Sequence, residues 1–351
     1  MKKLKIGISS GDMNGIGPEV IIKALSNPKI LDFCVPIIYG SSKVMAYHKN
    51  IVKDINFSFI STADPERASN TKVNVINCWD ESPNITLGMA TEEGGKYAHI
   101  ALDRAVNDAN EGKLDALVTA PINKEAMNMS NFRYPGHTEF LTDRMNKKDS
   151  LMMMVSDNIR IALVTNHIPI SDVSQSITKD KLIMKLKLFN RSLIQDFGIQ
   201  KPTIAVLGLN PHASDNGVIG DEEEKTIRPV IIEAKKNGVH AIGPFPADGF
   251  FGSNKFTKVD GILAMYHDQG LVPFKTLSFG TGVNFTAGLP IVRTSPDHGT
   301  AYDIAGKNEA DPSSFRTAMF LAMDLARNRL QFKEDRSNKL EKKPKPSERA
   351  E

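Results

Sequence analysis

Three of the eight histidines share one sequence context, because each follows a short apolar run. His167 comes after IALVTN, His212 after IAVLGLNP and His267 after ILAMY. The carboxyl ends of parallel strands meet at one edge of a sheet, where three imidazoles could bind a divalent cation and leave open positions for a substrate. Zinc or cobalt suits imidazole ligands, whereas oxygen-rich surroundings would admit magnesium. The alternative is three structural histidines bonded to backbone, and the repeated context favours the metal site.

A cation in such a site would act as a Lewis acid. It would lower the pKa of a chelated hydroxyl, assist hydride loss and stabilise the charge that develops when a β-keto acid decarboxylates. Polar residues near the histidines are candidates to orient the rings; they are Asn166, Asn210, Asp215, Asp268 and Gln269.

A second group of candidate residues lies in the glycine-rich, otherwise apolar stretch 268–301. It consists of Lys275, Asn284 and Arg293. An isolated buried cation is costly, so the lysine and arginine need a counter-charge. A substrate phosphate or carboxylate would provide one, and the alternative is a structural ion pair with an Asp or Glu.

The segment 133–143 adds His137 and Thr138 after a Pro-Gly turn, at a predicted helix start. A helix N-terminus is an anion site. Capping of the helix would explain the threonine equally well.

The elements that must position these residues alternate along the chain. Apolar runs at 5–11, 35–40, 116–121, 159–167, 203–210 and 261–267 are separated by helical patterns, among them 18–25, 92–112 and 179–198. This alternation predicts an α/β fold with a mostly parallel sheet. The glycine-rich segment SGDMNGIGPEVI (10–21) lacks the GxGxxG spacing, so it is weak evidence for a dinucleotide-binding loop.

The bulk composition excludes several classes of protein. A length of 351 residues fits two lobes, and a net charge of +3 requires no nucleic-acid partner. Two cysteines without CxxC spacing, no signal peptide and no membrane-length apolar segment predict a cytoplasmic enzyme. Residues 331–351 are basic and poor in apolar side chains, which predicts a disordered tail.

Several motifs together resemble the 4-hydroxythreonine-4-phosphate dehydrogenase family of vitamin B6 biosynthesis, in order from about residue 4 to about residue 330. They are GDMNGIGPE (11–19), TAPINKEAM (119–127), PGHTEFL (135–141), VTNHIPI (164–170), GLNPHASDNG (208–217), DGILAMYHDQGLVPFK (260–275), GVNFTAG (282–288) and SPDHGTAYDIAGKNEADPSSF (295–315). GIGPE and HGTAYDIAG (298–306) are also similar to motifs of the wider isocitrate and isopropylmalate dehydrogenase group. The family's usual GDPAGIGPE reads GDMNGIGPE here.

The resemblance implies the two-lobed α/β/α fold of that group, not a Rossmann domain. We expect a cofactor-side lobe of residues 1–130 and 280–330, and a metal, substrate and dimerisation lobe of residues 131–279. A homodimer with active sites shared at the subunit interface is also implied.

The implied reaction is oxidation of 4-phosphooxy-L-threonine by NAD or NADP, followed by decarboxylation to 3-amino-2-oxopropyl phosphate. The family's pattern assigns one divalent ion to His167, His212 and His267, with one of the three coming from the partner subunit. It assigns the substrate to His137, Thr138, Lys275, Asn284 and Arg293, and the cofactor to Gly299, Asp303 and Asn308. An acid at Asp303 would repel a 2′-phosphate, which favours NAD.

Some alternatives stay open at this stage. The general base is not identified, and Asp248, Asp268 and Lys275 are candidates by neighbourhood only. A dehydrogenase of erythronate or threonate 4-phosphate would use the same residues. The rivals from other classes are a metal-dependent hydrolase or lyase and a protein that only binds a phosphorylated ligand.

Overall fold

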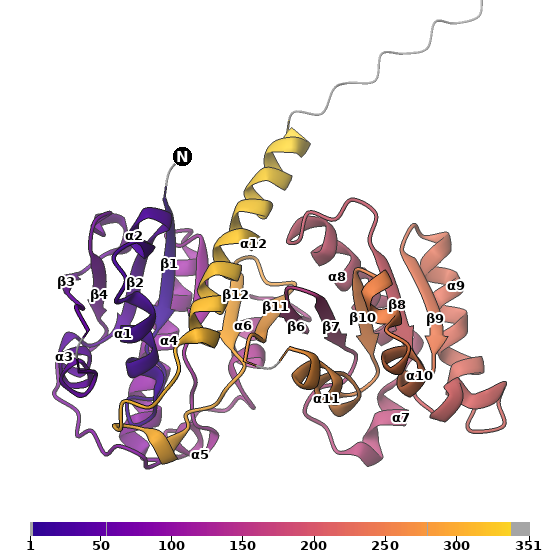
Figure 1. Ribbon diagram of the computed structural model, residues 1–351, viewed down its shortest axis with the longest axis horizontal. Coiled ribbons are helices and arrows are strands. Elements are labelled where there is room, and N and C mark those ends of the chain that lie inside the picture. The colour runs from indigo at the N-terminus through magenta and orange to yellow at the C-terminus, as the bar shows by residue number, and fades with distance from the viewer. Residues whose placement is uncertain (1–2, 54, 279, 338–351) are drawn as a thin grey trace, which may run out of the picture.

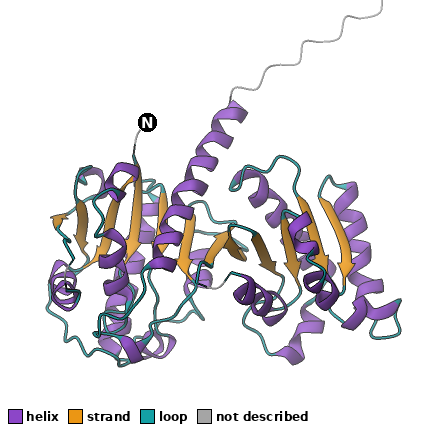
Figure 2. Ribbon diagram, viewed as in Figure 1, coloured by secondary structure: helices purple, strands orange, loops and turns teal. Residues whose placement is uncertain are grey.

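The computed structural model describes residues 3–53, 55–278 and 280–337, and strands alternate with helices along most of this length (Figure 2). The strands are β1 (Leu4–Ser9), β2 (Cys34–Gly40), β3 (Phe59–Thr62), β4 (Val73–Asn77), β5 (Ala116–Thr119), β6 (Leu151–Ser156), β7 (Ile159–Leu163), β8 (Thr203–Leu207), β9 (His240–Phe245), β10 (Gly261–Ala264), β11 (Val283–Ala287) and β12 (Val292–Pro296). The helices are α1 (Gly17–Leu25), α2 (Ile30–Phe33), α3 (Ser42–Ile51), α4 (Glu92–Asn110), α5 (Lys124–Met129), α6 (His137–Arg144), α7 (Val173–Ser176), α8 (Lys179–Gln195), α9 (Arg228–Lys236), α10 (Ala247–Gly252), α11 (His267–Leu277) and α12 (Ser313–Ser337).

Within the described residues, twelve strands form one sheet in the order β3-β4-β2-β1-β5-β12-β11-β6-β7-β10-β8-β9. Antiparallel pairing is confined to the middle of the sheet, at β12–β11, β11–β6 and β6–β7, and the other neighbours are parallel. The predicted α/β class with a mostly parallel sheet is therefore confirmed. Figure 1 shows β1–β4 at one end of the molecule and β8–β10 at the other. One sheet runs through both segments, so the lobe boundaries near residues 130 and 280 stay a prediction.

The two faces of the sheet are covered differently. Helices α1, α8, α9 and α12 share one continuous core with the strands along the first face. On the second face, α4 and α6 cover the N-terminal strands, while α10 and α11 form a separate core with β6, β7, β8 and β10. Between these two cores, β5, β12 and β11 contribute Thr119, Arg293 and Asn284 to a cavity. The polar cavity therefore lies where the apolar packing of the second face is interrupted.

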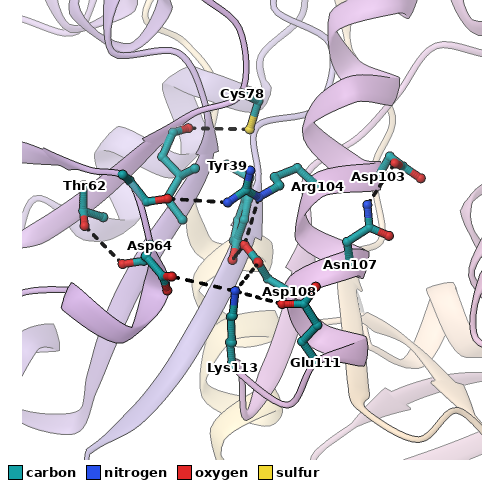
Figure 3. A network of polar contacts seen from close by, with 12 residues as sticks. Tyr39, Thr62, Asp64, Cys78, Asp103, Arg104, Asn107, Asp108, Glu111 and Lys113 are labelled. Carbon is teal, nitrogen blue, oxygen red and sulfur yellow. Dashed lines mark hydrogen bonds and ion pairs between the residues drawn. The ribbon is translucent and has the colours of Figure 1, made fainter.

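Helix α4 is fixed to β2 by a buried polar network (Figure 3). The Asp108 carboxylate, 2 % exposed, accepts from the Tyr39 hydroxyl at 2.9 Å, Arg104 Nε at 3.2 Å and Lys113 Nζ at 3.4 Å. These partners compensate the buried charge. The network thus fixes α4, which shares an apolar core with α6, but none of its residues lines the cavity described below.

Helix α12 continues to Ser337, so residues 331–337 are helical and the predicted disordered tail is wrong for this part. Pairs one turn apart support the helix beyond the core: Gln331 donates to Asp335 at 2.7 Å, and the Arg336 guanidinium lies 4.4 Å from the Phe332 ring centroid. The rest of the predicted tail, 338–351, lies outside the described residues. None of the described helices combines the length and the apolar content needed to cross a bilayer.

Candidate active site

A cavity of about 520 Å³, referred to as the main cavity, lies between the two cores of the second face. Strands β5, β6, β11 and β12, helices α6 and α11, and the segments after β7 and β12 contribute its lining. It brings together nine of the residues predicted from the sequence: His137, Thr138, His167, His267, Asp268, Lys275, Asn284, Arg293 and Gly299. His212, Asp248, Asp303 and Asn308 are not part of its lining.

Arg293 is the buried cation of this cavity, with 2 % of its surface exposed. Its Nε and Nη2 donate to Thr119 Oγ1 at 3.1 and 2.6 Å, and its Nη1 donates to Thr286 Oγ1 at 3.0 Å. Within the described part of the chain these bonds go to hydroxyls and none goes to a carboxylate. Burial lowers the pKa of the guanidinium to about 10, and the charge of Glu139 opposes this only in part. The alternative of a structural ion pair is therefore wrong for Arg293, and the cavity can accept an anion.

Four further buried polar atoms of the cavity lining have no hydrogen-bond partner among the described residues, namely His137 Nε2, Glu139 Oε2, Asn284 Oδ1 and His298 Nε2. Burial, assisted by the charge of Arg293, lowers the pKa of His137 well below its usual value. A neutral imidazole keeps one donor and one acceptor nitrogen. Since an unpaired buried polar group costs about 1–3 kcal/mol, a polar ligand that bonds these atoms would be favoured here.

Thr138 does not cap helix α6. The helix begins at His137, its N-cap is Gly136, and no side chain bonds its first amides. The capping explanation for Thr138 is therefore wrong, because the Pro-Gly turn starts the helix two residues earlier than that role requires. Thr138 instead lines the cavity in the first turn, where unpaired backbone N–H groups favour an anion.

Lys275 differs from Arg293, because it does have a carboxylate partner. Its Nζ lies 3.3 Å from Asp297 Oδ1, with the lysine side chain 55 % exposed. Burial raises the pKa of Asp297, and Lys275 partly offsets this rise. The ion-pair alternative holds for this lysine, and both members of the pair line the cavity.

His167 and His267 face each other across the cavity rim, with their ring centroids 5.8 Å apart. Nδ1 of His267 lies 2.7 Å from Asp268 Oδ1. A carboxylate in this position holds the proton on Nδ1 and leaves Nε2 free to bind a metal. Asp268 makes the contact that the predicted orienting role requires, and the role itself stays a prediction. Gln269 instead bonds backbone groups near the ends of β10 and β8.

His212 lies outside this cavity. It is exposed in the 3-10 turn Pro211–Asp215 and, together with Asp248, it lines a second cavity of about 750 Å³. Five consecutive residues of this loop, from His212 to Asn216, have positive φ. In the described residues no three His, Cys, Asp or Glu side chains are grouped closely enough to hold a metal ion. One chain thus brings two of the three predicted histidine ligands together, and the contribution of the third from a partner stays a prediction.

The loop 298–306 is held by the glycine-rich segment 11–19. Three hydrogen bonds join them: Ile16 N to Thr300 O at 3.0 Å, Gly306 N to Glu19 Oε1 at 2.6 Å, and the Tyr302 hydroxyl to Asp12 Oδ2 at 2.5 Å. A Cβ on Gly15 would lie 2.8 Å from the Thr300 carbonyl oxygen, so glycine is required at this approach. The GIGPE motif therefore supports the loop rather than forming a dinucleotide fingerprint.

The three predicted cofactor residues differ in their surroundings. Gly299 lines the main cavity, and Asp303 is exposed on the loop. Asn308 is left-handed, with φ of 61°, and its Oδ1 is buried without a partner among the described residues. Their assignment to a cofactor stays a prediction.

Sequence reasoning missed Glu139, Asp297 and the two threonines that hold Arg293. Glu139 and Asp297 line the cavity beside residues that were singled out, since Glu139 follows Thr138 directly. Position in the same motif was therefore the signal. Thr119 and Thr286 also lie in quoted motifs, TAPINKEAM and GVNFTAG, but threonine is common in strands, so its residue type does not indicate a contact with Arg293.

Comparison with known proteins gives consistent matches. The family model described as "Pyridoxal phosphate biosynthetic protein PdxA" matches residues 32–322. A relative from Bacteroides thetaiotaomicron, named 4-hydroxythreonine-4-phosphate dehydrogenase, is 50 % identical over 342 residues, covering 97 % of this chain and 93 % of the relative. A relative from Oceanobacillus iheyensis, named provisionally as a D-threonate 4-phosphate dehydrogenase, is 40 % identical and covers 93 % of this chain and 98 % of its own.

Among solved structures, the 4-hydroxythreonine-4-phosphate dehydrogenase from Klebsiella pneumoniae aligns with a TM-score of 0.82 and 34 % identity, over 92 % of this chain and 98 % of that chain. This agreement confirms the fold predicted from the resemblance.

Proposed function

Because the chain belongs to the PdxA family of pyridoxal phosphate biosynthetic proteins, we propose that it is an NAD(P)-dependent dehydrogenase of 4-phosphooxy-L-threonine. The C3 hydroxyl of this substrate is oxidised, and the resulting β-keto acid loses CO2 to give 3-amino-2-oxopropyl phosphate. The observation that carries the proposal is the buried guanidinium of Arg293, which has no carboxylate partner among the described residues, in a cavity that also contains two neighbouring imidazoles. Such a cavity suits a phosphorylated hydroxy acid, since it offers sites for both an anion and a chelating ion.

The chain's own residues would bind and orient the substrate. Arg293 supplies a planar, permanently charged donor for the phosphate or carboxylate, and the first turn of α6 adds amide donors near Thr138. His137 and Asn284 have buried polar atoms ready to bond the same groups. Two anionic groups on one small molecule would thus be held at fixed positions, which orients the C3 carbon between them.

We propose His167 and His267 as two ligands of a divalent ion, with His212 of the partner subunit as the third. The neighbouring rings and the carboxylate of Asp268 at His267 Nδ1 support this assignment. A zinc, cobalt or magnesium ion bound there would supply a Lewis acid for the substrate hydroxyl and for the charge that develops on decarboxylation.

The partner subunit is itself part of the proposal. Val272 and Leu277, 62 % and 48 % exposed, line the second cavity next to His212. Exposed apolar side chains gathered in one place are typical of protein interfaces. A homodimer that covers this cavity is the arrangement in which His212 would reach a neighbouring active site.

The proposed cofactor site is the loop 298–306 with Asn308. NAD or NADP bound there would supply the hydride acceptor. The exposed carboxylate of Asp303 would bond the ribose hydroxyls and repel a 2′-phosphate, so we propose NAD as the preferred cofactor.

Lys275 is the best placed of the three candidates for moving a proton. Asp248 lines the other cavity, and the carboxylate of Asp268 is occupied by His267. Lys275 lines the main cavity and has Asp297 3.3 Å away as a group with which to exchange a proton.

A second candidate substrate is D-threonate 4-phosphate. It is favoured by the Oceanobacillus iheyensis relative, which covers 93 % of this chain. This substrate and its isomer D-erythronate 4-phosphate carry the same phosphate, carboxylate and C3 hydroxyl, so the residues described above would serve them equally.

The test is an NADH absorbance assay on 4-phosphooxy-L-threonine and on both four-carbon acid phosphates, with and without chelator. We expect chelator-sensitive NADH formation with the amino acid, and 3-amino-2-oxopropyl phosphate and CO2 as products. Release of inorganic phosphate or cleavage without NADH would indicate a hydrolase or lyase instead. Binding without any turnover, unaffected by loss of His167 or His267, would indicate a ligand-binding protein.

A further inference from the structure

Three carboxylates line the main cavity, and they differ in whether they have a partner. Asp268 is bonded to His267 at 2.7 Å, and Asp297 is paired with Lys275 at 3.3 Å. Glu139 also lines the cavity, but its Oε2 is buried with no hydrogen-bond partner in the part of the chain that the structure describes. Glu139 is therefore the carboxylate whose bonding capacity is left for a ligand.

Glu139 shares the cavity lining with both Arg293 and His167. It occupies the first turn of α6, directly after Thr138. Its charge opposes the lowering of the pKa by burial at both Arg293 and His167, which places it near each of them. The guanidinium does not neutralise it by direct contact, because the bonds of Arg293 go to hydroxyls.

An unpaired carboxylate is at first sight out of place in a cavity that binds a phosphorylated acid. It would repel both anionic groups of such a ligand, and its own desolvation is costly. The arrangement becomes favourable if the ligand also carries a positive charge. 4-Phosphooxy-L-threonine does so, because its C2 bears an ammonium group with three donors.

We propose that Glu139 binds the C2 ammonium group of the substrate and selects the amino acid over the corresponding 2-hydroxy acid phosphates. This inference rests on the proposed function, which supplies the zwitterionic substrate. A 2-hydroxyl group offers one neutral donor at the same position and gains far less from a carboxylate. Glu139 thus decides between the two candidate substrates that the other cavity residues cannot separate.

The test compares binding of two ligands by titration calorimetry, using the full chain with zinc and without NAD. One ligand is 4-phosphooxy-L-threonine, and the other is the 2-hydroxy acid phosphate of the same carbon configuration. Wild type is expected to bind the amino compound at least about tenfold more tightly. In Glu139→Gln, which keeps the side-chain size, affinity for the amino compound should fall about 10- to 100-fold, as expected for loss of a charge-assisted hydrogen bond. Affinity for the hydroxy compound should change less than about threefold.

The matched control is Glu125→Gln, which removes one exposed negative charge on the adjacent helix α5 without altering the cavity lining. It should leave both affinities unchanged. Glu139→Asp, which keeps the charge on a shorter side chain, should retain part of the preference. Equal losses for the two ligands in Glu139→Gln, or no loss for either, would overturn the proposal.

The selectivity of the wild type tests the assignment of Glu139 even if Glu139→Gln fails to fold. No preference of the wild type for the amino compound overturns the assignment of Glu139. Selective binding without NADH formation overturns the proposed dehydrogenase and leaves the role of Glu139 supported. If Glu139→Gln keeps wild-type turnover of 4-phosphooxy-L-threonine, the role of Glu139 is overturned and the proposed dehydrogenase stays supported.

Discussion

Replacement of Arg293 by methionine should make the unliganded protein more stable while removing its affinity for phosphate. The guanidinium is 2 % exposed, and its pKa falls from 12.5 to about 10. At about 1.4 kcal/mol per pKa unit, the folded protein spends on the order of 3 kcal/mol to keep this group charged. Replacement by methionine removes this cost, but it also loses the bonds to Thr119 and Thr286, which lowers stability by about 1–2 kcal/mol. A net gain of about 1–2 kcal/mol in the free energy of unfolding is expected.

The assay is urea unfolding in a buffer free of phosphate and sulfate, read from the midpoint at constant slope. Arg329 provides the matched control, because it is another buried arginine but has a carboxylate partner. Its Nε lies 2.6 Å from Asp196 Oδ1, and the two side chains are 8 % and 2 % exposed. Arg329→Met should therefore lower stability by about 3–5 kcal/mol, since it leaves a buried charge unpaired.

Inorganic phosphate should distinguish the variants a second time. Phosphate at one hundred times its dissociation constant should stabilise the wild type by about 2.7 kcal/mol, and it should not stabilise Arg293→Met. The kcat/KM for the phosphorylated substrate should fall at least about 100-fold. The reasoning is refuted if Arg293→Met is less stable than wild type without phosphate, or if phosphate stabilises both proteins equally.

Three other predictions follow from the same structure. Single variants His212→Ala and His267→Ala should each lose most activity, whereas unfolding and refolding them together should restore about a quarter of it; half of randomly formed dimers are mixed, and one of their two sites is intact. Recovery of nothing would argue against a shared site. His48 is buried, its Nε2 donates to Met13 O at 2.8 Å, and burial lowers its pKa from 6.5 to about 4. The neutral ring therefore contributes fully to the free energy of unfolding above pH 6.5, and this contribution should fall by about 1.4 kcal/mol per pH unit between pH 6.5 and 4. In His48→Gln, the urea midpoint should lack this part of its dependence on pH. Asp108→Leu should cost about 2–3 kcal/mol in urea unfolding with kcat unchanged, because the network in Figure 3 supports α4 but holds no cavity residue.

Residues near the ends of strands were predictable, because a parallel sheet gathers those ends at one edge. His167 and His267 follow β7 and β10, which are neighbours in the sheet, and they meet as expected. His212 follows β8, which is also next to β10, yet it lines a different cavity. Strand order alone would place it with the other two. The left-handed loop from His212 to Asn216 decides its position, and no spacing rule gives the direction of such a loop.

The position of the cavity had a signal in the sequence that strand prediction does not use. In β11, Val283, Phe285 and Ala287 belong to the continuous core of the first face, and Asn284 lines the cavity from the opposite face. A sheet with helices on both faces should have apolar side chains on both, and its strands then read as unbroken apolar runs. A central strand that alternates apolar and polar residues therefore indicates a gap in one of the two cores. Applied to residues 283–287 and to Arg293 after Val292, this rule predicts a cavity at β11 and β12 on the face opposite α12, before any histidine is considered.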